Sequence, residues 1–131
     1  MKLFISVITV VLLVLLAGNI TFATTKDSTA AFSKENLCKV WVLKDFKEDG
    51  KAQDLYDYEI EFKSNGVYKE TEEGDTEKGV WELNDSGSSI IFDKGTLDQD
   101  EWLIVNLNSD KLIVKFSNED KNCQFILVPE K

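Results

Sequence analysis

Residues 56–68 carry the pattern that decides the fold, and they read Tyr56-Asp57-Tyr58-Glu59-Ile60-Glu61-Phe62-Lys63-Ser64-Asn65-Gly66-Val67-Tyr68. Apolar and aromatic side chains alternate with charged ones up to Lys63, which is the period of two that a strand with one buried face and one wet face requires. If Phe62 and Tyr68 face the same side, the link between them is a three-residue hairpin loop, residues 64–66. Gly66 then supplies the left-handed residue of a bulge. The stretch therefore predicts an antiparallel hairpin.

Similar segments recur along the chain at the spacing of about 8–12 residues that is typical of all-β barrels and sandwiches. We expect eight strands, over residues 38–46, 55–63, 67–71, 78–83, 88–93, 101–107, 111–117 and 123–128. The links between them are short, which favours antiparallel pairing in sequence order. Such a meander either closes into an up-and-down barrel or splits into two packed sheets. We predict an all-β, eight-stranded antiparallel barrel, preceded by at most one helical turn.

The N-terminal 23 residues have the layout of a secretory signal peptide. Lys2 precedes an almost wholly apolar run over residues 3–17, and small residues stand at positions 21 and 23, before a cleavage site. An uncleaved anchor is the rival interpretation, because residues 3–22 approach the roughly 20 residues of a membrane span. Asn19 stands where a bacterial lipoprotein would have its lipidated cysteine. We expect a signal peptide over 1–23, a lead-in over 24–36, a barrel domain over 37–131, and a secreted or periplasmic location.

The composition excludes several kinds of chemistry. The 131 residues include 15 Lys, no Arg, no His and 24 acidic residues, for a net charge of −9. Without His there is no Ser–His or Cys–His nucleophile pair and no His-ligated zinc. The acidic balance argues against nucleic acid as a partner. We therefore predict no catalytic residue, no metal site and no cofactor.

Two acidic clusters, residues 70–77 and 93–101, are predicted to lie on loops between strands. Asp98, Asp100 and Glu101 offer a fragment of a calcium-binding pattern, but the glycine and the distal glutamate of an EF-hand loop are missing. Like-charge runs are usually hydrated surface. We interpret both clusters as solvated loops.

Cys38 and Cys123 are the two cysteines of the chain. In an exported protein two thiols favour a disulfide, and buried free thiols are the alternative. The pairing has a difficulty, because each cysteine opens its strand and antiparallel first and last strands would place them at opposite ends. We predict the Cys38–Cys123 disulfide, which needs a register offset to form.

An ordered set of motifs resembles the bacterial lipocalin-like domains. The set is Leu37–Leu43 with its first-strand Trp41, the hairpin Tyr58–Lys69, the Gly-x-Trp of Gly79–Asp85, and the strand–turn–strand of residues 107–112. This resemblance covers most of residues 37–128 and implies a small exported eight-stranded barrel. One position departs from lipocalins proper, which open with Gly-x-Trp, because Lys39 stands at the place of that glycine.

The resemblance and the aromatic content leave the interior open to two interpretations. In the first, inward side chains line a pocket for a small apolar ligand, and the candidate residues are Trp41, Tyr58, Ile60, Phe62, Tyr68, Trp81 and Trp102. In the second, these side chains simply fill the barrel. The first predicts a non-catalytic binding protein. The second predicts an interaction or inhibitory module that acts through its loops on an envelope or secreted protein.

Overall fold

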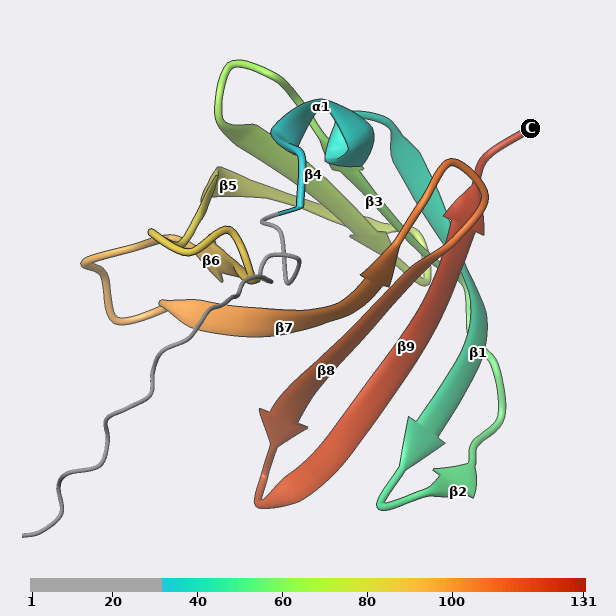
Figure 1. The fold of residues 1–131 in the computed structure, drawn as a ribbon. Coiled ribbons are helices and arrows are strands. Elements are labelled where there is room, and N and C mark those ends of the chain that lie inside the picture. The colour runs from blue at the N-terminus through green and yellow to red at the C-terminus, as the bar shows by residue number, and fades with distance from the viewer. Residues whose placement is uncertain (1–31) are drawn as a thin grey trace, which may run out of the picture. The chain divides into compact units, whose positions relative to one another are not determined.

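The computed structural model describes residues 32–131, which form one short helix and nine strands (Figure 1). The elements are α1 (Lys34–Leu37), β1 (Val40–Glu48), β2 (Lys51–Ala52), β3 (Tyr58–Phe62), β4 (Val67–Glu72), β5 (Asp75–Leu83), β6 (Ser89–Phe92), β7 (Asp100–Leu107), β8 (Leu112–Asn118) and β9 (Lys121–Pro129). The predicted signal peptide lies outside the described residues. Within residues 32–131, the one helix, α1, is too short to cross a membrane.

The sheet closes into a barrel. Strands β3 to β9 pair antiparallel in sequence order, β1 pairs with β3, and β9 returns to pair with β1 from Trp41↔Pro129 to Glu48↔Cys123. This confirms the predicted eight-stranded up-and-down barrel rather than two packed sheets, with β2 as an additional two-residue strand on the end of β1. Closure pairs the first strand with the last and so removes the edges of the sheet.

The hairpin between β3 and β4 forms as the sequence predicts. Phe62 pairs with Tyr68, and the backbone N–H of Lys63 donates to the carbonyl oxygen of Val67 at 2.9 Å. Gly66 has φ +88°, in the left-handed region that a Cβ disfavours. Its carbonyl oxygen also accepts from the backbone N–H of Trp81, which ties this turn to β5.

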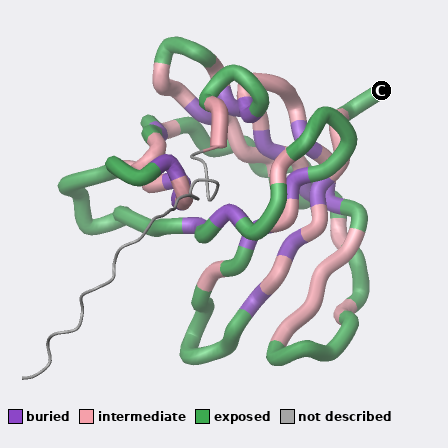
Figure 2. The backbone as a smooth tube through the Cα atoms, in the orientation of Figure 1, coloured by how far each residue is buried: buried purple, intermediate pink, exposed green. Residues whose placement is uncertain are grey.

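Alternation along the strands builds the core. All seven side chains predicted for the barrel interior are buried: Trp41, Tyr58, Ile60, Phe62, Tyr68, Trp81 and Trp102. Buried positions alternate with half-buried ones along β3 and β9 and with half-buried or exposed ones in β8 (Figure 2). Register irregularities after Leu43 in β1 and after Ile104 in β7 interrupt the pairing. Such bulges bend strands, as a closed barrel requires.

Helix α1 closes one end of the barrel, next to the β3–β4 hairpin (Figure 1). Leu37 is fully buried, and its carbonyl oxygen accepts the indole N–H of Trp41 at 3.0 Å. The ammonium of Lys39, at the place of the lipocalin glycine, lies 5.2 Å from the centre of the Trp41 ring, a distance that allows a cation–π interaction. The lead-in therefore ends in the single helical turn that the sequence predicts.

The predicted disulfide is wrong, because both cysteines are free thiols. Cys123 lies opposite Glu48 in the β1–β9 pair, whereas Cys38 precedes β1 at its other end. Ten residue steps separate Cys38 from Glu48, which is about 30 Å of extended strand at about 3.3 Å per residue. A bulge in β1 shifts the register by one residue only, far too little to bring the two sulfur atoms together.

Both thiols should therefore be unreactive in the folded protein and free in the unfolded one. Burial raises the pKa of Cys123, as do Glu48 and Asp49, and burial also raises the pKa of Cys38. Less thiolate means slower alkylation. We expect iodoacetamide to label the native protein slowly and to label both cysteines once denaturant is added, with no reductant present. Mass spectrometry reads this directly, and labelling in denaturant that required a reductant would contradict it.

Candidate ligand site at the mouth of the barrel

The end of the barrel opposite α1 is open, and we call it the mouth. It is formed where β1, β4, β6 and β8 end and where β3, β5, β7 and β9 begin. The β1–β2 and β8–β9 hairpins extend at this end (Figure 1). Side chains that point inward near these strand ends are therefore the ones that a ligand entering the barrel would meet.

The half of the barrel next to α1 is packed. Trp41, Ile60 and Phe62 are at most 1% exposed, and Trp81 donates its indole N–H to the carbonyl oxygen of Lys63 at 3.0 Å. The ring centres of Phe62 and Trp81 lie 5.0 Å apart in an edge-to-face arrangement. These four predicted site residues are thus filled core and do not line the hollows of the mouth.

Two adjoining hollows lie at the mouth, with volumes of about 300 and 280 Å³. Glu70, Asp100 and Trp102 line both. Tyr58 lines the first and Tyr68 the second. Three of the seven predicted interior residues therefore reach a space that a ligand could occupy: Tyr58, Tyr68 and Trp102.

Five rings line the larger hollow, and four of them, which we call the aromatic floor, form its apolar wall beside Tyr56: Tyr58, Trp102, Phe116 and Phe125. Phe125 lies at their centre, with ring centres 5.2 Å from Tyr58, 5.8 Å from Trp102 and 4.9 Å from Phe116. Trp102 stacks on Phe116 at 5.5 Å. Each ring stands at an inward position of its strand, so β3, β7, β8 and β9 each contribute one ring to the floor.

Five carboxylates, which we call the acidic rim, stand above the floor on inward positions of β4, β5 and β7. They are Glu70, Glu72, Asp75, Glu77 and Asp100. Each has the inward parity of a buried aromatic residue on its own strand: Tyr68 on β4, Trp81 on β5 and Trp102 on β7. Glu70 pairs directly with Glu77, and Glu72 with Asp75.

The prediction that residues 70–77 form a loop is therefore wrong, whereas the predicted exposure to solvent holds for residues 72–77. Residues 70–77 are the ends of β4 and β5, joined by a tight turn at Glu73-Gly74, and four of them belong to the acidic rim. The sequence-based prediction missed these strand ends because a run of acidic residues was interpreted as a loop. The signal that could have found them is the period of two, which continues from Tyr68 through Glu70 to Glu72.

Glu70 is the most buried acid that the site uses. Tyr58 donates its hydroxyl hydrogen to a carboxylate oxygen of Glu70. Burial raises the pKa of Glu70, the hydrogen bond from Tyr58 opposes this, and Glu72, Glu77 and Asp100 add to the rise. The carboxylates at the mouth therefore repel one another.

A second tyrosine–carboxylate pair borders the smaller hollow. Tyr68 donates its hydroxyl hydrogen to Asp93 Oδ2 at 2.7 Å, and the backbone N–H of Val80 donates to Asp93 Oδ1 at 3.1 Å. Gly79 lies beneath this pair, and a Cβ there would stand 2.2 Å from Asp93 Oδ1 and 2.7 Å from the Tyr68 ring. The missing side chain leaves room for both groups.

The three tyrosines of the chain should all titrate abnormally. Burial raises the pKa of Tyr56 to about 12, and burial with nearby carboxylates also raises the pKa values of Tyr58 and Tyr68. A phenol whose pKa is higher in the folded than in the unfolded protein stabilises the fold as long as the phenol is neutral. This contribution to the free energy of unfolding is fully present below pH 10, the usual pKa of the unfolded state, and is lost as the pH rises through 12.

We expect the native protein to show almost no phenolate absorbance between pH 9.5 and 11, whereas the protein in urea titrates near pH 10. Ultraviolet difference spectroscopy measures this. A native titration with a pKa near 10 for two or more tyrosines would contradict the buried phenol–carboxylate pairs, because only Tyr56 lies outside them.

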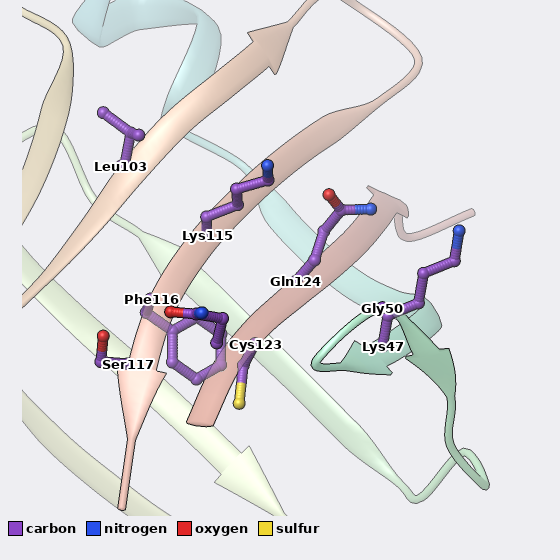
Figure 3. A pocket seen from close by; sticks show the side chains of 9 residues that line it. Lys47, Gly50, Leu103, Lys115, Phe116, Ser117, Cys123 and Gln124 are labelled. Carbon is purple, nitrogen blue, oxygen red and sulfur yellow. The ribbon is translucent and has the colours of Figure 1, made fainter. Parts of the chain in front are cut away.

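A third hollow, of about 450 Å³, lies on the outer face of the barrel (Figure 3). Its wall includes one row of outward side chains in register across β7, β8, β9 and β1: Leu103, Lys115, Gln124 and Lys47. This row is mostly polar, but Phe116 and Cys123 also line the hollow, and its exposed lining is more apolar than that of the mouth. The outer hollow is larger, but at the mouth several aromatic rings meet converging polar groups, the combination that fixes a ligand in a site.

Within residues 32–131, no group of three His, Cys, Asp or Glu side chains is placed to hold a metal ion. The acidic rim is spread over three strands around the opening.

Comparisons with known proteins support the fold. No protein-family model matches the chain, and no curated protein matches it. A solved structure of a lipocalin-like protein from Bacteroides uniformis is similar, with a TM-score of 0.56 and 16% sequence identity over 72% of this chain and 99% of that chain. At this identity the likeness concerns the fold, and the predicted lipocalin-like barrel is confirmed.

Proposed function

We propose that this lipocalin-like barrel is an exported, non-catalytic protein that binds one small amphipathic ligand in its mouth. The observation that carries the proposal is a hollow of about 300 Å³ with an aromatic floor on one side and the open end of the barrel on the other. A cavity of about 150 Å³ in another protein holds benzene. The mouth therefore has room for a single-ring molecule with a short substituent.

The position of the hollow refines the sequence-based proposal of a ligand in the centre of the barrel. The half next to α1 is filled by Trp41, Ile60, Phe62 and Trp81, so a ligand would enter no deeper than Phe125. A packed half keeps the barrel rigid beneath the site, which reduces the ordering that binding requires.

Trp102 provides the test of binding, because it lines both hollows. We expect Nile red, a neutral apolar probe, to bind at low micromolar concentration and to quench tryptophan emission by energy transfer. Phe125→Leu should lower the affinity, since it removes a ring of the floor and Phe125 lines the mouth hollow but not the outer one. The control Val105→Ala, on an exposed outward position of β7, should leave the affinity unchanged. Absence of probe binding to the folded protein would favour the alternative, an interaction module acting through its loops.

Export is a separate part of the proposal and has its own test. The layout of residues 1–23 supports a cleaved signal peptide. We expect protein recovered from the medium or the periplasm to begin at Thr24, as read by mass spectrometry. Recovery of the uncleaved chain from the membrane fraction would instead support the anchor.

A further inference from the structure

The inward face of the mouth carries negative charge that the protein itself does not neutralise. Among residues 32–131 the ion pairs are Lys94–Glu82 and Lys121–Glu48, and neither includes a residue of the acidic rim. Glu70 lies directly opposite Glu77, and like charges that face each other across strands destabilise a sheet. The barrel therefore keeps an arrangement that a bound cation would stabilise.

The outward face of the same strands is arranged differently. Lys69 and Lys78 also pair directly across β4 and β5, but Glu61 lies opposite Lys69 on its other side. The outer face thus mixes both signs, whereas the inward positions of β4 and β5 beyond Tyr68 and Gly79 are all acidic. Lys78 also lines the smaller hollow, so the excess negative charge is greatest at the larger hollow, whose charged lining residues are Glu70, Glu72 and Asp100.

Trp102 supplies an independent sign of a ligand. It is 5% exposed and lines both hollows, yet its indole N–H has no hydrogen-bond acceptor within the described part of the chain. The indole N–H groups of Trp41 and Trp81 both donate to backbone carbonyl oxygens at 3.0 Å. A buried donor without an acceptor is unfavourable. An acceptor atom on a ligand would satisfy it.

Aromatic ring faces and carboxylates together favour one chemical class of ligand, an organic cation. Ring faces attract a cation through their quadrupole, and carboxylates accept charge-assisted hydrogen bonds from an ammonium group. The floor rings would also bury the apolar body of the molecule. An anionic or purely apolar ligand would gain nothing from the acidic rim.

We propose that the ligand is a small organic ammonium ion with an aromatic or other apolar body and a hydroxyl or similar acceptor group. This rests on the proposed function, ligand binding in the mouth. The body lies on the aromatic floor, the acceptor receives the Trp102 indole N–H, and the ammonium group lies between Glu70, Glu77 and Asp100.

Three single-ring phenols of similar size test the charge. They are tyramine, which is cationic, 4-ethylphenol, which is neutral, and 3-(4-hydroxyphenyl)propionate, which is anionic. Each is titrated into ¹⁵N-labelled protein, and the three indole N–H signals are followed by NMR after assignment of Trp102 with Trp102→Phe. We expect tyramine to move the Trp102 signal and to bind at least about tenfold more tightly than 4-ethylphenol, equivalent to about 1.4 kcal/mol. The anion should not bind.

Two double variants with the same change of charge test the rim. Glu70→Gln/Glu77→Gln alters two inward acids, and Glu59→Gln/Glu101→Gln alters two outward acids of β3 and β7. We expect the first to weaken tyramine binding by about tenfold or more, as loss of charge-assisted hydrogen bonds predicts. The second should change it less than about twofold, as expected for screened surface charge. Thermal melts confirm that both variants fold.

The outcomes separate the two proposals. Equal binding of tyramine and 4-ethylphenol, insensitive to Glu70 and Glu77, would overturn the cation inference and leave ligand binding in the mouth intact. Nile red binding without tyramine binding would do the same. Failure of both probes would overturn both proposals. Displacement of tyramine by millimolar Ca²⁺, with Ca²⁺ alone reproducing the Trp102 shift, would assign the rim to a metal ion and also overturn the inference.

Discussion

Replacing Trp41 with alanine is expected to lower the free energy of unfolding by about 3–5 kcal/mol. The side chain is fully buried in the half of the barrel that α1 closes. Its removal leaves a cavity among packed neighbours and leaves the carbonyl oxygen of Leu37 without its indole donor. For a domain of about 100 residues the usual stability is only about 5–15 kcal/mol, so the loss is a large fraction of it. Urea denaturation followed by circular dichroism measures the change.

Two control variants separate packing from the hydrogen bond. Trp41→Phe keeps most of the apolar volume and loses the indole N–H, so we expect a smaller loss than for alanine. Val105→Ala removes a side chain that is 46% exposed on the outer face of β7, and surface changes of this kind usually stay within about 0.5 kcal/mol. A Trp41→Ala protein as stable as Val105→Ala would contradict a packed core next to α1.

The strand pattern could be predicted from sequence because the period of two is a local signal. Tyr58, Ile60 and Phe62 alternate with Asp57, Glu59 and Glu61, and one buried and one wet face follow directly from that alternation. Gly66 likewise marks its turn, because few other residues accept its positive φ. The number of strands and the short links between them predicted a meander, which could either close into a barrel or split into two packed sheets.

The division of the barrel into a packed half and an open mouth could not be predicted in this way. Trp41 and Tyr58 have the same inward parity, and parity contains no information about height along the barrel. Height depends on the register of every strand pair and on α1, which closes the end near Trp41 through Leu37. The same long-range register places Cys123 opposite Glu48, far from Cys38, and so prevents the disulfide.

The acidic rim was missed for a different reason. A run of acids between two predicted strands ordinarily indicates hydrated loop, and at residues 73 and 74 it does. Glu70 and Glu77 instead continue their strands inward, where ordinary patterning would place apolar side chains. A local rule broken on the inner face of a barrel is typical of a functional position.

Gly79→Ala is expected to destabilise the barrel by about 1–3 kcal/mol, the usual penalty for overpacking. Gly79 is in ordinary strand conformation, and replacing a glycine by alanine without strain normally stabilises by about 0.4–1 kcal/mol. Here the added methyl group would stand 2.2 Å from Asp93 Oδ1. Asp93 cannot simply rotate away, because it accepts hydrogen bonds from both Tyr68 and Val80.

A double-mutant cycle assigns that penalty to its cause. In an Asp93→Ala background the nearest atom is gone, so the added cost of Gly79→Ala should fall, leaving the contact with the Tyr68 ring. Val80→Ala, on the exposed outward neighbour, controls for a general effect of alanine in β5. The single variant Gly79→Ala should also separate the Tyr68 hydroxyl from Asp93. Because the nearby carboxylate helps to raise the pKa of Tyr68, this pKa should then fall toward 10 in the absorbance titration. A Gly79→Ala protein as stable as the parent, with an unchanged tyrosine titration, would show that the tyrosine–carboxylate pair does not depend on the missing side chain.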